Sequence, residues 1–129
     1  MARPLKRMTT LDNVVASAFL RAKSKAEAKE MALEMLQFTG LVQDQNVVSK
    51  GLPLGKRKKL EITRALVTQP EMLLLDESFA GLNPSEQNVK QTLLVANRGY
   101  VLETGKITHQ GTGESLLADE HLKTAYLGV

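Results

Sequence analysis

The sequence predicts an α/β fold, and three of its features carry that prediction. Residues 72–75 form a short apolar run that follows a proline and ends in two acids, which is typical of a strand buried on both faces of a parallel sheet. Residues 56–68 place apolar side chains at helical spacing shortly before that run. Segments 100–102 and 107–109 flank a turn that contains glycine, which predicts a β-hairpin. A chain of 129 residues, of which 43% are hydrophobic, fits one domain.

The N-terminal part of the chain predicts two helices. The first covers about residues 11–21. The second begins at Ser24, where Glu27 completes a capping box, and its apolar side chains repeat at helical spacing until Gly40. From these residues taken by themselves, an ordinary pair of helices that pack their apolar stripes together explains the region.

A third helix, over residues 56–68, is expected to follow a tight turn marked by Pro53 and Gly55. A helix N-terminus presents unpaired N–H groups and the positive end of the helix dipole, so this end favours a phosphate group. Its first turn is also basic, because residues 56–59 are all lysine or arginine. A basic run of this length is also typical of a solvated helix face.

Asp76 and Glu77 come directly after the apolar run. In open α/β sheets, ligands bind beyond the carboxyl ends of the strands. The two acids therefore predict a divided task, in which one holds Mg²⁺ and the other orients a water molecule. A buried strand that simply ends in solvated acids explains the same residues.

The C-terminal part predicts two short helices after the hairpin, around residues 114–118 and 120–126. The two histidines, His109 and His121, have no partner motif nearby. We expect them to be ordinary surface residues.

Composition limits the class of protein. The chain has no cysteine, so it has neither a disulfide framework nor a thiolate metal site. No apolar run approaches the roughly eighteen residues of a membrane span, and a cytoplasmic location is expected. The net charge of +3 and the basic run suggest phosphate contacts with a nucleic acid. However, two tyrosines and three phenylalanines offer no evident stacking platform, so nucleic acid is not an expected partner.

Three consecutive segments resemble motifs of the ATP-binding subunits of ABC transporters, most closely those of branched-chain amino acid importers. Residues 52–56, LPLGK, resemble a variant of the signature motif LSGGQ that lacks its serine, first glycine and glutamine. Residues 73–77 resemble the Walker B strand, and residues 80–84, AGLNP, resemble the D-loop. The order and spacing of the three motifs agree with the family. Segments 8–14 and 98–129 resemble the start of the helical subdomain and the C-terminal part of the same subunits.

This resemblance implies a partial P-loop NTPase fold of the ABC ATPase type, in a single domain over residues 1–129 and with an incomplete parallel sheet. Residues 8–50 would form the helical subdomain. Residues 51–85 would supply the signature helix, the Walker B strand and the D-loop. Residues 86–129 would supply the switch segment, the C-terminal hairpin and the last helices.

The resemblance also implies ATP and Mg²⁺ as cofactors and a role for each motif. In this family two ATP-binding subunits pair head to tail, so the signature motif of one chain contacts the nucleotide held by the other. The implied site residues are Leu54, Gly55 and Lys56 for the γ-phosphate in trans, Asn83 of the D-loop for the nucleotide, Asp76 for Mg²⁺, Glu77 for the attacking water, and Gln87 at the switch position that the family often fills with histidine.

One motif of the family does not occur in the 129 residues. Tight phosphate binding requires the pattern GxxxxGK[ST]. Residues 51–56 and 99–106 both end in Gly-Lys, but with the wrong spacing and without a following Ser or Thr. Residues 3–5 resemble those just after the Q-loop glutamine, so the resemblance places the Walker A and the Q-loop upstream of Met1. Residues 86–91 follow the D-loop directly, which indicates an internal deletion of a helix and a strand before the switch segment.

Three functions are compatible with these observations. The first is an ATPase module of a solute importer that uses the Walker A of another ATP-binding subunit and does not hydrolyse ATP by itself. The second is a non-catalytic interaction module that docks on a permease or on a complete ATP-binding subunit. The third is a decayed gene product, whose small sheet would expose strand edges and apolar surface. The expected partners are a Walker A-bearing subunit and membrane permease subunits, at the inner face of the cell membrane.

Overall fold

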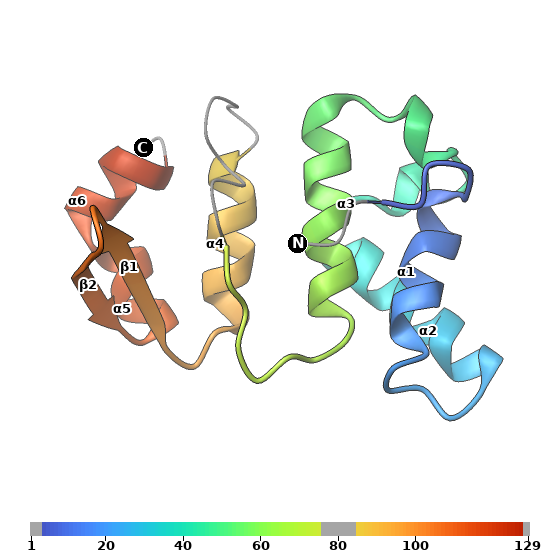
Figure 1. The fold of residues 1–129 in the computed structure, drawn as a ribbon, viewed down its shortest axis with the longest axis horizontal. Helices are drawn as coiled ribbons and strands as arrows, with labels where there is room; N and C mark the ends of the chain where they lie inside the picture. The colour runs from blue at the N-terminus through green and yellow to red at the C-terminus, as the bar shows by residue number, and fades with distance from the viewer. Residues whose placement is uncertain (1–3, 76–84, 128–129) are drawn as a thin grey trace. The chain divides into compact units, whose positions relative to one another are not determined.

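The computed structural model describes residues 4–75 and 85–127, with side chains outside that description at 85–88 and 126–127 (Figure 1). The chain divides into two compact units, Met1–Ser78 and Phe79–Val129. The first unit contains α1 (Thr10–Ala18), α2 (Lys25–Phe38), the 3₁₀ turns η1 (Val42–Asp44) and η2 (Ser49–Gly51), and α3 (Leu54–Leu66). The second contains α4 (Ser85–Val95), β1 (Gly99–Glu103), β2 (Lys106–Gly111), α5 (Gly113–Ala118), α6 (Glu120–Leu122) and the π-helical turn η3 (Lys123–Leu127).

The core of the first unit forms where α1, α2 and α3 meet. Small side chains on α1 and α2 allow the helices to approach closely, and larger aliphatic side chains fill the space that remains. The buried cluster consists of Val14, Ala18, Ala28, Ala32, Leu36, Leu41, Leu52, Leu60 and Val67. The three predicted helices of this unit are therefore confirmed, and they share one apolar core.

The start and the end of α2 follow the predicted signals. The Ser24 hydroxyl accepts a hydrogen bond from the Glu27 N–H at 3.1 Å, and the Glu27 carboxylate accepts one from the Lys23 N–H at 2.6 Å. At the other end Gly40 has a φ of +72°, and the Leu41 N–H bonds to the Leu36 carbonyl at 2.8 Å. This is the pattern of a Schellman C-cap, which needs a residue without a Cβ penalty at that position.

The expected bounds of the other two helices need correction. α1 ends at Ala18, three residues before the expected Arg21. α3 begins at Leu54, with Pro53 as its N-cap, so Gly55 lies inside the first helical turn and not in a turn before it. Proline has a fixed φ that suits the start of a helix, and it can therefore begin α3 without a glycine turn.

Polar contacts fix how α3 lies on its neighbours. The Thr63 hydroxyl donates to the Thr39 hydroxyl at 2.9 Å inside the core. The Arg64 guanidinium donates through Nε to the Ser17 hydroxyl of α1 at 3.1 Å. Because such bonds are directional, they set the rotation of α3 about its axis, which apolar packing by itself sets only loosely.

The second unit contains the predicted hairpin. β1 and β2 pair antiparallel from Gly99–Gly111 to Glu103–Lys106, with an irregularity in register between Val101 and Leu102. Thr104 and Gly105 have φ values of +50° and +76°, as the two central residues of a type I′ turn require. Two short helices, α5 and α6, follow the hairpin as expected. A Cβ at Gly113 would collide with the Leu93 carbonyl, so the start of α5 can approach α4 only with glycine there.

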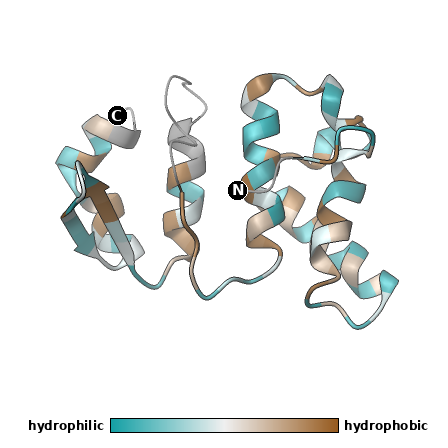
Figure 2. Cartoon of the chain, viewed as in Figure 1, coloured by the Kyte–Doolittle hydropathy of each residue, from teal (hydrophilic) through white to brown (hydrophobic). Residues whose placement is uncertain are grey.

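The predicted buried strand at residues 72–75 is wrong for this structure. These residues have no regular secondary structure and no strand partner, and the sheet within the described residues is the antiparallel hairpin of β1 and β2. Met72 and Leu74 are 78% and 76% exposed, and Figure 2 colours this apolar stretch brown. A strand of this type needs a neighbour on each side and a layer on each face, and within the first unit residues 4–75 supply neither to it.

Across the described ranges, the helices are all too short or too polar to cross a membrane.

Replacing Ser24 with Ala removes the oxygen that caps α2, and we expect the free energy of unfolding to fall by about 1 kcal/mol. Denaturant unfolding followed by circular dichroism measures this change. Ser24→Asp is the matched control, because a carboxylate caps the same N–H group and should keep most of the stability. Equal stability of Ser24→Ala and the unchanged chain would show that the cap contributes nothing.

Candidate functional site

The first turn of α3 holds three of the predicted site residues, Leu54, Gly55 and Lys56. Gln87 lies in the first turn of α4, in the other unit, and its side chain is not among those described. Asp76, Glu77 and Asn83 lie outside the described residues. The structure therefore gives the geometry of the signature segment, and the roles of the other four residues stay predictions.

The start of α3 has the polarity of an anion site. The first backbone hydrogen bond of this end runs from the Arg57 N–H to the Pro53 carbonyl at 3.0 Å, so the N–H groups of Leu54, Gly55 and Lys56 precede the helical ladder. The N-cap residue is Pro53, whose side chain has no oxygen that could accept a hydrogen bond from them. Leu54 is 51% exposed, which leaves this turn open to a ligand. Free N–H groups at the positive end of a helix dipole favour a phosphate.

Lys56 does not extend freely into solvent. Its Nζ lies 2.8 Å from each carboxylate oxygen of Asp44, the last residue of η1. The side chains of Lys56 and Asp44 are 48% and 17% exposed, so the lysine faces solvent while the carboxylate is largely covered. The first turn of α3 is therefore tied to η1 by a partly buried ion pair, and removing Lys56 would leave the Asp44 carboxylate poorly solvated. Sequence reasoning missed Asp44, because nothing in its own segment marks it as a partner of a residue twelve positions later.

The basic run at residues 56–59 is not a uniform solvated face. Burial lowers the pKa of Lys59, the positive charge of Lys56 lowers it further, and the carboxylate of Asp44 opposes both effects. The Lys59 Nζ lies close to Gly40, at the C-terminal end of α2, where the helix dipole favours a cation. Arg57 has a buried Nε without a hydrogen-bond partner among the described residues. Asp44 is thus the carboxylate that balances this group of cations.

The two histidines lie together in the second unit. The rings of His109 on β2 and His121 on α6 stack with their centroids 5.3 Å apart. Backbone N–H groups of Leu122 and His121 bond to Asp119, and this hydrogen bonding holds the pKa of its carboxyl below the usual value. Among the residues with described positions, no three metal-ligating side chains gather at one place.

Replacing Asp44 with Asn removes the charge that opposes the lowering of the Lys59 pKa, so we expect Lys59 to titrate at a lower pH. The folded pKa lies below the unfolded value of 10.5. The unfolded chain therefore binds more protons in the interval between them, and the free energy of unfolding rises with pH there. In Asp44→Asn the folded pKa of Lys59 falls further, so the pH range over which the free energy of unfolding rises with pH begins at a lower pH.

Side-chain NMR of the lysine Cε and Nζ atoms measures the titration directly. Glu30→Gln, on the exposed face of α2, is the control and should leave Lys59 unchanged. An unaltered Lys59 titration in Asp44→Asn would contradict this account of the basic run.

Comparison with known proteins gives the family. The family model described as ABC transporter matches residues 2–80. The lipopolysaccharide export system ATP-binding protein LptB of Escherichia coli (strain K12) is 31% identical over 146 residues, covering 95% of this chain and 61% of LptB. The high-affinity branched-chain amino acid transport ATP-binding protein LivG of Salmonella typhimurium (strain LT2) is 34% identical over 134 residues, covering 86% of this chain and 52% of LivG. The chain thus spans about half to three fifths of the length of these relatives.

Solved structures agree on the fold. A structure of MJ1267, an ATP-binding cassette of an ABC transporter, matches with a TM-score of 0.64 and 23% identity, over 96% of this chain and 64% of that one. The same cassette in its ADP conformation matches with a TM-score of 0.57 and 22% identity, over 97% and 65%. At these identities the likeness concerns the fold, which is that of the P-loop NTPases. The family model covers more than half of the sequence, and the chain therefore belongs to the ABC transporter family, among its ATP-binding subunits.

Proposed function

We propose that this chain supplies the signature half of an ATP site in an ABC transporter and that the P-loop of the site lies outside these 129 residues. The observation that carries the proposal is the first turn of α3, where N–H groups that have no hydrogen bond within the described residues occur together with an exposed position and a basic side chain. The sequence has no GxxxxGK[ST] pattern of its own. A nucleotide bound at this turn therefore needs a second phosphate-binding element.

In this proposal the N–H groups of Leu54 and Gly55 donate to the terminal phosphate of a nucleotide held by a second ATP-binding subunit. Lys56 adds a positive charge where charge develops during phosphoryl transfer, which is where electrostatic stabilisation is most effective. Lys56 reaches that position by leaving Asp44, whose side chain is 17% exposed, so the attraction of the nucleotide phosphate has to offset the loss of this partly buried ion pair.

The remaining assignments are part of the same proposal. Glu77 would polarise the attacking water, Asp76 would hold Mg²⁺, Asn83 would contact the nucleotide from the D-loop, and Gln87 would take the switch position. Bound Mg²⁺ neutralises phosphate charge in such sites.

We propose that the chain takes part in ATP-driven transport through permease subunits, at the inner face of the membrane. We do not assign the transported solute. The names of the relatives point to two different cargoes, lipopolysaccharide and branched-chain amino acids. The match to LivG supports transport of branched-chain amino acids, and the match to LptB supports export of lipopolysaccharide. The alignment with LptB is 146 positions long although this chain has 129 residues, which supports the proposed internal shortening.

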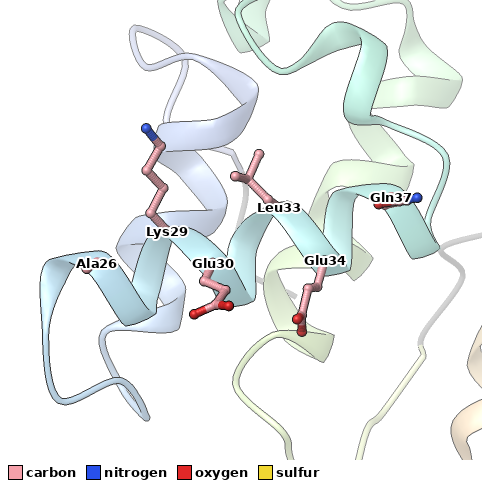
Figure 3. Close-up of a pocket in the computed structure, with 6 residues that line it drawn as sticks. All are labelled: Ala26, Lys29, Glu30, Leu33, Glu34 and Gln37. Carbon is pink, nitrogen blue, oxygen red and sulfur yellow. The ribbon is translucent and has the colours of Figure 1, made fainter.

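A second candidate function, a non-catalytic docking module, is favoured by the outer face of α2. A shallow open pocket there is lined by side chains from this one helix (Figure 3), namely Ala26, Lys29, Glu30, Leu33, Glu34 and Gln37. Lysine and glutamate are less frequent at protein interfaces than on the rest of the surface, so a partner bound here would make mainly polar contacts of the kind found at an interface rim. The exposed Met72 and Leu74 instead support the decayed gene product, because they leave apolar surface uncovered.

The test is whether this chain associates with a complete ATP-binding subunit only when ATP is present. The complete subunit carries GxxxxGK[ST], and its own catalytic glutamate is replaced so that it does not hydrolyse the bound ATP. Sedimentation should show a complex with ATP and none without it. Lys56→Glu should weaken the complex at least about tenfold, because it places a negative charge against phosphate.

Asp44→Asn is the matched control, because it breaks the same ion pair but keeps the Lys56 charge. Association of this variant should equal or exceed that of the unchanged chain. Nucleotide-independent association that ignores Lys56→Glu would favour the docking module instead.

A further inference from the structure

The second unit brings the two histidines of the chain together from two different elements. His109 lies on β2 and His121 on α6, and their rings stack with the centroids 5.3 Å apart and the planes at 24°. The sequence holds two histidines and no cysteine in its 129 residues. All of its imidazole groups therefore meet at this one place, and imidazole is a preferred ligand of divalent transition-metal ions.

A hydrogen-bonded chain along β2 orients the ring of His109. The Thr108 hydroxyl donates to the Val101 carbonyl at 3.4 Å, and the same oxygen lies 3.1 Å from Nδ1 of His109. Because the hydroxyl gives its hydrogen to the carbonyl, it accepts from His109, which assigns the hydrogen of the neutral ring to Nδ1 and a free lone pair to Nε2. Histidines that bind metal ions in proteins are usually oriented by such a bond from the other ring nitrogen.

The start of α6 holds the backbone of His121 and leaves its ring free. Oδ1 of Asp119 accepts hydrogen bonds from the N–H groups of His121 at 2.9 Å and Leu122 at 3.1 Å. The neighbouring Leu122 is 3% exposed, so the helix is anchored on one side. The side chain of His121 itself is exposed, and exposed side chains change rotamer within nanoseconds.

Asp119 also places a negative charge near both rings. The hydrogen bond from Leu122 is the main cause that holds the pKa of its carboxyl below the usual value, and the charges that His109 and His121 carry when protonated lower this pKa as well. The carboxylate therefore lies within electrostatic reach of both imidazoles. The same negative charge favours a bound cation between the rings.

The separation of the rings suits one shared metal ion. Zinc binds a histidine nitrogen at about 2.0–2.1 Å, which sets the centroids of two coordinating rings roughly 5 Å apart. The centroids of His109 and His121 are already 5.3 Å apart. With the planes at 24°, the two lone pairs converge on one ion after the exposed ring of His121 rotates. The described residues bring no third ligand to this place, so water completes the coordination.

We propose that His109 and His121 form a binding site for a divalent transition-metal ion, and that Thr108 is a positioning residue for His109. The bound ion joins β2 to α6 and so stabilises the second unit in proportion to the free metal concentration. The site needs no nucleotide and does not depend on the proposed function.

The test is titration of the untagged chain with Zn²⁺, followed by NMR of the imidazole signals. The signals of both histidines should shift together, with one dissociation constant and about one ion per chain. His121→Ala should weaken binding at least about tenfold, because the loss of an outer-shell partner by itself typically costs about 10–100-fold. The substitution changes an exposed side chain and keeps the Asp119 cap of α6.

The positioning role of Thr108 has its own pair of variants. Thr108→Val removes the hydroxyl and should weaken Zn²⁺ binding about tenfold, whereas Thr108→Ser keeps the hydroxyl and should restore it. The midpoint of urea unfolding should rise with Zn²⁺ in the unchanged chain and in Thr108→Ser, and should not rise in His121→Ala. Equal affinity of Thr108→Val and the unchanged chain would refute the positioning role.

Mg²⁺ is the control ion, because it prefers oxygen ligands and should leave the imidazole signals in place. An equal response to Mg²⁺ would overturn the proposal, since the ion would then bind through carboxylates. A shift of one histidine without the other, or unchanged Zn²⁺ affinity in His121→Ala, would also overturn it.

Discussion

The burial of one face of α3 against α1 and α2 is the constraint on which the rest of the first unit depends. Leu60 is fully buried and Val67 is 1% exposed, both belong to the core cluster with α1 and α2, and the hydrophobic effect supplies most of the free energy that holds the helix there. The polar bonds from Thr63 to Thr39 and from Arg64 to Ser17 then fix its rotation. Because the helix is fixed, so are the direction of its dipole and the place where its free N–H groups point.

Positive charge at the start of α3 determines what this helix end can bind. Residues 56–59 are four consecutive cations, and burial lowers the pKa of Lys59. A nearby negative charge therefore stabilises the charged forms of these side chains. Asp44 supplies it in the structure. A nucleotide phosphate would supply it in the proposed site, and the competition between the two anions for Lys56 is the physical link between the resting arrangement and the proposed function.

The sequence predicted correctly the helix ends and turns that depend only on residues a few positions apart in the chain. Ser24, Glu27 and Gly40 act within a few residues of their own backbone, and the Thr104–Gly105 turn sets the hairpin by itself, so each was found where expected. The strand at residues 72–75 depends on neighbours that the described residues lack, so its apolar pattern was not sufficient.

The candidate site shows the same division. The first turn of α3 was recognisable from a motif, although the helix begins earlier than expected. Asp44 acts on Lys56, twelve residues later in the chain, and leaves no pattern in the sequence that points to this partner. Asp76, Glu77, Asn83 and Gln87 keep the roles that the family resemblance implies as predictions.

The central claim is that these residues carry the signature half of a nucleotide site without its phosphate-binding loop. Equilibrium binding of Mg²⁺-ATP to the purified chain, measured by calorimetry with Asp76→Asn as the control, tests it most directly. The account predicts binding weaker than about 1 mM that the substitution leaves unchanged, since one helix N-terminus and exposed charges hold a phosphate only weakly. Binding at about 1 μM that is lost in Asp76→Asn would contradict it, because a complete nucleotide site would then be present within the 129 residues.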